Sequence, residues 1–489
     1  MREAESRRTA NIGRNSDYLS LRSVYHGLFY DRRARDAMDG AGRVLLRDNR
    51  RADEHQPIVA NLLKAIVDDF ISLTSQVPDT KVPPPGTEPS DQEFADLIEK
   101  YHYGVAHASR WRLHLKALSW FNSVLGSAAG IVWPDFRRRH AALRIVGPDK
   151  VFGTADLIDP FSYSSAAIIE SYSPRTILDY FPSKRLRQFV EENTARRAAW
   201  WGEGDRVQIV RWFDTEQVVT ILGREVTPIR QRKAGESTRI EPLVEMGRVD
   251  HGLGVCTVVP FQNFLIPGEL RSMSDIEEAV GLNQFINFLL NAHEEGIKQE
   301  LFAPLVLIDP DKAPEDIDLS NAMEIIPIRK GGDAKRLQGA TNAQQVMSSE
   351  LSRSQSLIEY VTGSSAIRTQ GRQPASSIAT GRSLEKGQAP QMTRVEYKTD
   401  LRSEAIEKMQ EISVLMTGSI FRSDDVELFG TKGRSGNLFK VKMKGRDLDG
   451  YTYNLVSYPP SMYMGMEQRI VAMEQLMGCD HPMVSVRTA

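Results

Sequence analysis

Cysteine is almost absent from this chain of 489 residues, which contains only Cys256 and Cys479. Two cysteines in apolar surroundings cannot supply the disulfide framework of an oxidising compartment, so we expect a reducing one. Long hydrophobic runs are also missing, because the most apolar segments, 286–290 and 304–308, are far shorter than the roughly 20 residues of a membrane-spanning helix. The charged residues 1–8 have no apolar stretch behind them, which predicts no secretory signal. We therefore expect no membrane contact.

The chain also lacks an excess of charge of either sign, since 62 basic residues stand against 64 acidic residues. A global positive field that would drive tight binding to nucleic-acid phosphates is therefore excluded. Any contact with DNA is expected to be loose or confined to a small part of the surface. Hydrophobic residues make up 41% and charged residues 26%, which is typical of folded domains, and the length predicts several structural units.

Motifs for enzymatic chemistry are missing as well. Residues 430–436 have the composition of a phosphate-binding loop without its spacing, and we interpret them as a hairpin loop. His293 precedes two glutamates as in a zinc-binding helix, but Ile297 occupies the place of the second ligand. The sequence predicts no catalytic residue, no metal site and no cofactor.

One enzymatic alternative stays open on acidic pairs. Asp316 with Asp318, and Asp447 with Asp449, could hold divalent ions in a metal-dependent nucleic-acid-processing enzyme. Surface loops would explain the same pairs.

Helical and β-type patterns together indicate an α+β protein with several domains. Apolar residues at helical spacing predict a helix near 57–73, and the proline-rich residues 81–90 end this first unit. A second helical stretch is expected over 91–127. Short β-type runs, among them 129–133, 207–213 and 218–222, then indicate a mixed α/β region over 130–259.

Two long helices that bracket a small β element are the most informative pattern. Ser274 to Glu277 has the form of a capping box, and a helix from 274 to 298 would be roughly 38 Å long. Two β-type runs follow at 305–308 and 324–328. A second helix is expected from 342 until Gly363 terminates it.

The remainder of the chain begins with a basic loop. Residues 363–381 are rich in Gly, Ser and Thr, contain two arginines and have no acidic residue. A helix is expected over 383–416, with Pro390 kinking it or delaying its start. The last elements predicted are two strands and a methionine-rich helix, near 439–443, 453–456 and 462–477.

This order of elements resembles the portal proteins of tailed bacteriophages over most of the chain. The most specific stretches are VVPFQN at 258–263, SDI at 274–276 and LNQFIN at 282–287, which are similar to the strand and first stem helix of many portals. VTG at 361–363 and ATGRSL at 379–384 are similar to the pattern that flanks the family's tunnel loop.

The resemblance implies a portal-type fold with long stem helices, a small α/β clip, a mixed α/β wing and a helical C-terminal crown. On this chain the N-terminal region and wing would comprise residues 1–273. The first stem helix would follow at 274–300, the clip at 301–340, the second stem helix at 341–362 and the tunnel loop at 363–382. The long kinked helix and wing strands would occupy 383–458, and the crown 459–489. The implied stem residues are Ile276, Phe285, Ile286, Leu289, Val346 and Leu357. The implied DNA-facing loop residues are Arg368, Gln370, Arg372, Gln373 and Arg382.

The function implied by the resemblance is a non-enzymatic channel at one capsid vertex, through which double-stranded DNA is packaged and ejected. The implied partners are other copies of the chain in a dodecameric ring, double-stranded DNA, a terminase, a head-tail adaptor, and the major capsid and scaffolding proteins. The implied location is the virion, with the host cytoplasm during assembly. Another virion adaptor or minor capsid protein is a further alternative. Repeated by symmetry, sparse arginine rings would guide a polyanion without trapping it.

Overall fold

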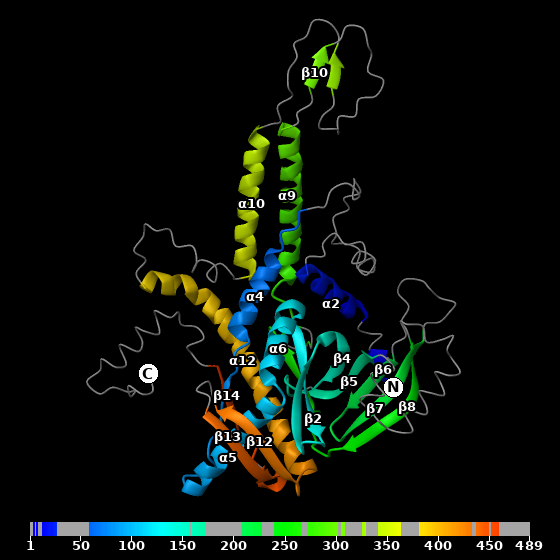
Figure 1. Cartoon of the computed structure of the whole chain (residues 1–489), viewed down its shortest axis with the longest axis vertical. Coiled ribbons are helices and arrows are strands. Elements are labelled where there is room, and N and C mark those ends of the chain that lie inside the picture. The colour runs from blue at the N-terminus through cyan, green and yellow to red at the C-terminus, as the bar shows by residue number, and fades with distance from the viewer. Residues whose placement is uncertain are drawn as a thin grey trace, which may run out of the picture. The chain divides into compact units, whose positions relative to one another are not determined.

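The chain is described by a computed structural model (Figure 1). The described residues are 3–4, 6–7, 12–26, 58–156, 158–172, 207–226, 239–266, 269, 272–301, 305–308, 325–328, 341–362, 381–432, 437–448 and 451–458. Within them the fold combines helices with several separate sheets, as expected for an α+β protein. The chain divides into two compact units, of which unit 1 comprises 1–22, 67–275 and 374–489, and unit 2 comprises 23–66 and 276–373.

Membrane crossing was tested on the described helices. None of them is both long enough and apolar enough to span a bilayer.

Two helices of unit 1 replace the single helical stretch predicted over 91–127. They are α5 (Pro89–Ala108) and α6 (Trp111–Leu125). The predicted stretch is helical, but it is divided where Arg110 adopts the left-handed conformation, with φ of 53°, which ends a right-handed helix. A second left-handed residue, Gly126 (φ 79°), terminates α6 and leads directly into a strand.

Two antiparallel sheets follow in unit 1. The three-stranded sheet has the order β3-β2-β9 and is built from β2 (Ser127–Asp135), β3 (His140–Val146) and β9 (Val258–Gln262). After the short η1 (Pro148–Lys150), the five-stranded sheet runs through β4 (Val151–Ala155), β5 (Tyr163–Tyr172), β6 (Val207–Phe213), β7 (Gln217–Val226) and β8 (Arg239–Asp250). The three β-type runs named from the sequence all lie within strands, so these predictions are confirmed.

The core of unit 1 forms around the long helix α12 (Gly381–Ile420). Its buried apolar residues recur at helical spacing at Ala405, Ile406, Met409, Ile412 and Met416, and they join one cluster with residues of α5, α6, β2, β3 and β9. The helix begins at Gly381 and continues through Pro390 without a break, so the expected delay at this proline was wrong.

Four further strands and a short helix complete the described part of unit 1. The strands β12 (Asp425–Lys432) and β13 (Asn437–Lys444) form an antiparallel hairpin, followed by η3 (Gly445–Leu448). Strand β1 (Asp79–Lys81) pairs with β14 (Leu455–Ser457) near the other end of the sequence. The strands predicted near 439–443 and 453–456 are confirmed, whereas the methionine-rich helix at 462–477 lies outside the described residues.

Unit 2 contains the two predicted long helices. They are α9 (Val280–Leu301), preceded by η2 (Glu277–Ala279), and α10 (Thr341–Thr362), and they lie side by side in opposite directions (Figure 1). Between them in sequence, β10 (Leu305–Ile308) and β11 (Ile325–Ile328) pair in parallel. Both β-type runs and the second helix are confirmed.

Two helices have residues in both units, α2 (Ile12–Tyr25) and α4 (Leu62–Thr74). The prediction of a helix near 57–73 is confirmed for its main part, but α4 begins at Leu62 because residues 58–61 are not helical.

Gly126 gives a first testable prediction, because its position combines a positive φ with close packing. A Cβ added there would lie 2.2 Å from the backbone oxygen of Ser272. The left-handed conformation costs an alanine about 1–2 kcal/mol, and the clash requires a backbone shift. We expect Gly126→Ala to lower the free energy of unfolding by about 3 kcal/mol in urea denaturation.

The matched control is Gly252→Ala. Gly252 also has a positive φ, of 59°, but a Cβ there would meet nothing within 4 Å. We therefore expect Gly252→Ala to lower the free energy of unfolding by only about 1 kcal/mol. If the two variants lowered the free energy of unfolding equally, the contact with Ser272 would not contribute to the effect of Gly126→Ala.

Candidate interaction surface on the helical hairpin

The interior of the α9–α10 hairpin contains polar as well as apolar residues, since Asn283, Asn287 and Ser354 are also buried. Three of the predicted stem residues lie in it, since Ile276, Ile286 and Leu289 are buried. Ile358 of α10 is also buried. These residues stabilise unit 2 itself and are shielded from any other molecule.

An asparagine ladder on α9 holds the extended residues 58–62. The N–H groups of Ile58, Ala60 and Leu62 donate to the side-chain oxygens of Asn291, Asn287 and Asn283, at 2.8, 2.8 and 3.2 Å respectively. Four residues of a helix rise about 6 Å, close to the rise of about 6.6 Å for two residues of extended chain. Every second N–H of the segment therefore meets every fourth residue of α9.

This ladder and the cap at Asn61, whose side-chain oxygen accepts a hydrogen bond from the N–H of Lys64 at 3.1 Å, account for a helix that begins only at Leu62. The N–H groups that a helix would leave unpaired in its first turn are bound by side chains of α9, two of which, Asn283 and Asn287, are buried. The sequence analysis did not predict this role of the asparagines. The available signal was their spacing, since Asn283, Asn287 and Asn291 lie four residues apart on one face of α9.

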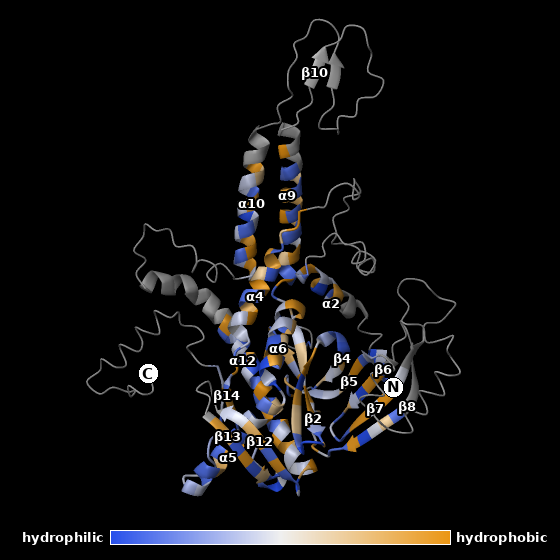
Figure 2. Cartoon of the chain, viewed as in Figure 1, coloured by the Kyte–Doolittle hydropathy of each residue, from blue (hydrophilic) through white to orange (hydrophobic). Residues whose placement is uncertain are grey.

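A second set of apolar residues on the hairpin faces outward. Phe285 and Phe288 of α9, and Val346, Leu357 and Tyr360 of α10, are between 41% and 80% exposed. Figure 2 shows apolar residues recurring along both helices. The predicted stem residues thus separate into a buried group and an exposed group that contains Phe285, Val346 and Leu357.

The exposed residues of α10 form a continuous stripe. Val346, Glu350, Arg353, Leu357 and Tyr360 follow the spacing of three and four residues that places side chains on one helix face. The charged members pair with each other, since a guanidinium nitrogen of Arg353 lies 3.6 Å from Glu350 Oε1. The exposed apolar residues of α10 thus recur on one helix face, and α9 adds Phe285 and Phe288.

The predicted loop residues are only partly within the described residues. Arg368, Gln370, Arg372 and Gln373 lie outside them. Arg382 is the second residue of α12, so its backbone is helical and does not belong to a loop. The loop was expected to extend to 382, whereas helix α12 begins one residue earlier, at Gly381.

The predicted capping box at Ser274 to Glu277 does not start the stem helix. The N-cap of η2 is Ile276, without a side-chain capping hydrogen bond, and α9 begins at Val280. Asp275 instead forms a buried ion pair with Lys398 of α12. The same carboxylate oxygen accepts a hydrogen bond of 2.9 Å from Asn263. The prediction was therefore wrong about where the helix begins.

Aromatic rings surround this ion pair. The ammonium of Lys398 lies 4.3 Å from the ring centroid of Phe70 and 5.0 Å from that of Phe264. A cation over an aromatic face is stabilised by the ring quadrupole. Asp275 and Lys398 thus join α12 to the chain just before η2, entirely within unit 1.

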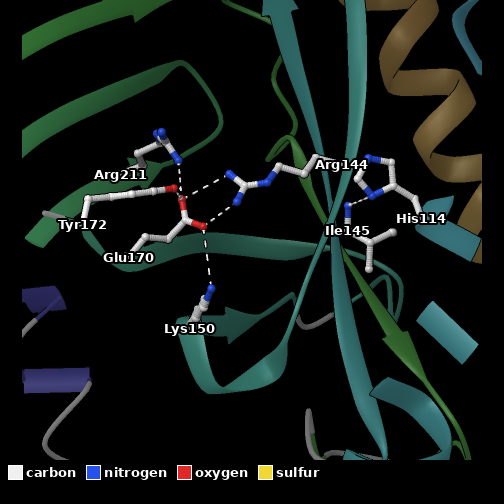
Figure 3. A network of polar contacts seen from close by, with 7 residues as sticks. All are labelled: His114, Arg144, Ile145, Lys150, Glu170, Tyr172 and Arg211. Carbon is white, nitrogen blue, oxygen red and sulfur yellow. Dashed lines mark hydrogen bonds and ion pairs between the residues drawn. The ribbon is translucent and has the colours of Figure 1, made fainter. Parts of the chain in front are cut away.

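A second polar network in unit 1 centres on Glu170 of β5 (Figure 3). Its buried carboxylate accepts hydrogen bonds from Arg144 at 2.5 and 3.1 Å, Arg211 at 2.8 Å and Tyr172 at 3.0 Å. The ammonium of Lys150 lies 4.0 Å away. Burial by itself would raise the pKa of Glu170, but the hydrogen bonds and charges of Arg144, together with Arg211 and Tyr172, hold it below its ordinary value.

The Glu170 network connects the two sheets of unit 1 and is structural in character. Arg144 belongs to β3 and Arg211 to β6. Beside it, the N–H of Ile145 donates to His114 Nδ1 at 3.5 Å. Burial and the charge of Arg144 lower the pKa of His114. Both carboxylate oxygens of Glu170 are thus engaged by donors of the same unit.

Only one member of the acidic pairs of the enzymatic alternative, Asp447, lies in the described part of the chain. Asp447 lies in η3 and accepts a hydrogen bond from the N–H of Lys444 at 2.8 Å. Asp316, Asp318 and Asp449 lie outside the described residues. Among the described residues there is no group of three His, Cys, Asp or Glu side chains that could hold a metal ion.

Comparison with known proteins gives no relative: no protein-family model and no curated protein matches this chain.

Proposed function

We propose that this chain is the subunit of a phage portal ring, a homo-oligomeric channel for packaging and ejecting double-stranded DNA. The observation that carries the proposal is the outward apolar surface on both helices of the α9–α10 hairpin. A hairpin that had only to stabilise its own unit would need one apolar face. This hairpin has a buried interior and additional apolar side chains exposed to solvent.

A closed ring requires two different complementary surfaces on each subunit, because every copy meets its neighbours head to tail. The hairpin supplies two such surfaces. Phe285 and Phe288 project from α9, and Val346, Leu357 and Tyr360 project from α10. In the proposed ring, the aromatic pair of one copy packs against the stripe of the next copy.

The remaining parts of the proposal depend on the sequence resemblance and the charge balance. With 62 basic and 64 acidic residues, the channel would let DNA slide, guided by Arg368 and Arg372 in the proposed tunnel loop. A terminase, a head-tail adaptor, and capsid and scaffolding proteins would dock on the ring. The dodecameric state, the portal-type fold and the location at a capsid vertex belong to the same proposal.

Electron microscopy and mass photometry of the purified chain test the proposal. We expect closed rings whose mass is a multiple of 55.0 kDa. Phe288→Glu or Leu357→Glu should raise the concentration at which rings dissociate by roughly 30-fold or more, because a carboxylate would enter an apolar contact.

The matched control is Ser352→Glu, which adds the same charge to an exposed position of α10 outside the stripe. It should leave the rings unchanged. A stable monomer of the unmodified chain at high concentration would overturn the proposal. Cleavage of DNA that requires a divalent metal and is lost in Asp447→Asn would support the enzymatic alternative instead.

A further inference from the structure

A cavity of about 1200 Å³ lies within unit 1 and contains no residue of the proposed ring contact. It lies where the end of α5 and the start of α6 meet strand β12 and residues 77–79. Trp111 and Leu428 line it, but both are buried and belong to the core of unit 1. Leu113 and Phe429 of the lining are 62% and 58% exposed. These two side chains are therefore the apolar groups that another molecule could cover.

The charged side chains of the lining have both signs. Apart from histidines, they are Asp79, Arg110, Arg112, Arg138 and Glu427. The carboxylate of Glu427 is engaged by Lys440 at 3.3 Å and by Lys442 at 3.5 Å. The guanidinium of Arg138 lies 3.9 Å from the carboxylate of Asp135. The remaining three groups, two arginines and one aspartate, form no ion pair with another described residue, so positive charge is in excess.

The turn between β2 and β3 extends this positive charge beyond the cavity. Residues 136–139 have the sequence FRRR, and all four are exposed. Arg138 joins the turn to α5, because its guanidinium donates a hydrogen bond of 2.8 Å to the carbonyl oxygen of the last residue of that helix. Arg139 lies 3.6 Å from Asp424. Arg137 has no carboxylate partner within the described part of the chain, so its charge adds to the excess.

Guanidiniums and exposed apolar side chains thus occur together on adjoining elements of unit 1. We call this set the arginine surface, and its members are Arg110, Arg112, Leu113, Arg137 and Phe429. Arginine binds a carboxylate through two parallel N–H donors. Complementary charge therefore favours a partner that carries carboxylates beside apolar groups.

The apolar members and Asp79 favour a peptide over a nucleic acid. Double-stranded DNA carries one phosphate charge per about 1.7 Å of its axis, so its phosphates would approach the carboxylate of Asp79 as well as the arginines. The phosphates would also leave Leu113 and Phe429 without an apolar partner. A peptide can place carboxylates beside the guanidiniums, a neutral residue beside Asp79 and an apolar side chain in the cavity.

We propose that the arginine surface binds an acidic peptide segment of a partner protein. Carboxylates of this segment pair with Arg110, Arg112 and Arg137. An apolar side chain between them enters the cavity and covers Leu113 and Phe429. All of these residues belong to unit 1, and the proposal does not require ring formation.

Fluorescence anisotropy with the full-length chain tests the proposal. The probe is a labelled synthetic octapeptide with Leu and Phe at its centre and three glutamates on each side. We expect saturable binding that weakens tenfold or more in Arg112→Glu, because the reversed charge repels the probe. Leu113→Ser should weaken binding about fivefold, since it removes apolar area from the contact. A second octapeptide with glutamine in place of every glutamate should bind at least tenfold more weakly than the first.

The matched control is Arg248→Glu, which reverses the charge of another arginine of unit 1, 52% exposed on β8. It should leave the affinity for the acidic probe unchanged. Three results would each overturn the proposal: no binding of the acidic probe, equal binding of the glutamine probe, or unchanged affinity in both Arg112→Glu and Leu113→Ser. Tighter binding of a short DNA duplex than of the acidic probe, lost in Arg112→Glu, would assign the surface to a nucleic acid and overturn the peptide assignment.

Two further measurements separate this proposal from the proposed function. Leu357→Glu, which should weaken the rings, should bind the acidic probe with unchanged affinity. Arg112→Glu should still form rings in electron microscopy. Loss of rings in Arg112→Glu would place the arginine surface in the contact between copies, and would overturn its assignment to a partner protein.

Discussion

Replacing Lys398 with methionine is expected to lower the free energy of unfolding by about 3–5 kcal/mol, the usual cost of removing one partner of a buried ion pair. The side chains of Lys398 and Asp275 are only 5% and 4% exposed. Without the ammonium, the buried Asp275 carboxylate would keep the hydrogen bond from Asn263 but would lose its counter-charge. Urea denaturation of the two proteins measures the difference.

Two further variants make this prediction specific. Lys398→Met combined with Asp275→Leu should recover much of the lost stability, because an apolar pair no longer buries an uncompensated charge. Lys440→Met, which breaks the exposed pair with Glu427, should cost less than about 1 kcal/mol. If Lys398→Met lowered the free energy of unfolding no more than Lys440→Met does, the ion pair between Asp275 and Lys398 would have no structural importance.

Replacing Glu170 with glutamine is expected to lower the free energy of unfolding by about 2–3 kcal/mol. The carboxylate is 3% exposed and pairs with Arg144 and Arg211. Its removal leaves two guanidinium groups without a counter-charge. The expected loss lies below the range for a fully buried pair because Arg144 is 42% exposed and can regain water.

The effect of Glu170→Gln should depend on pH. The folded protein holds the pKa of Glu170 below its ordinary value, so the carboxylate stabilises the fold fully above the unfolded pKa of about 4.3. This contribution is lost as the pH falls through the folded pKa. The difference between the two proteins in urea midpoint should be constant from about pH 6 to 8 and shrink below about pH 4. A difference that grew on acidification would contradict the assigned direction.

Elements whose signal is local were predictable from the sequence. The helix at 341–362 and the strands at 207–213 and 305–308 follow from apolar periodicity and from flanking residues such as Gly363. Their hydrogen bonds or side-chain patterns connect positions close together in the chain. Pairing partners were not predictable, since β1 and β14 are separated by most of the chain.

Long-range contacts also decided where the predicted helices begin. The segment before Leu62 is extended because asparagines of α9, more than 200 residues away, bind its N–H groups. The helix predicted from Ser274 begins later, with η2 at Glu277 and α9 at Val280. The long-range hydrogen bonds from α9 to residues 58–62 cannot be read from a local pattern, whereas the cap at Asn61, which accepts a hydrogen bond from the N–H of Lys64, is local.

The sequence by itself determined that the chain has two long amphipathic helices around a small β element, because a periodic apolar pattern is a property of the segment alone. Only the tertiary structure decided which of their apolar residues are interior. It buries Ile286 and Leu289 and leaves Phe285, Val346 and Leu357 exposed. The physical reason is that hydrophobicity specifies that a residue favours burial, whereas the position of the neighbouring helix specifies which residues the chain itself can cover.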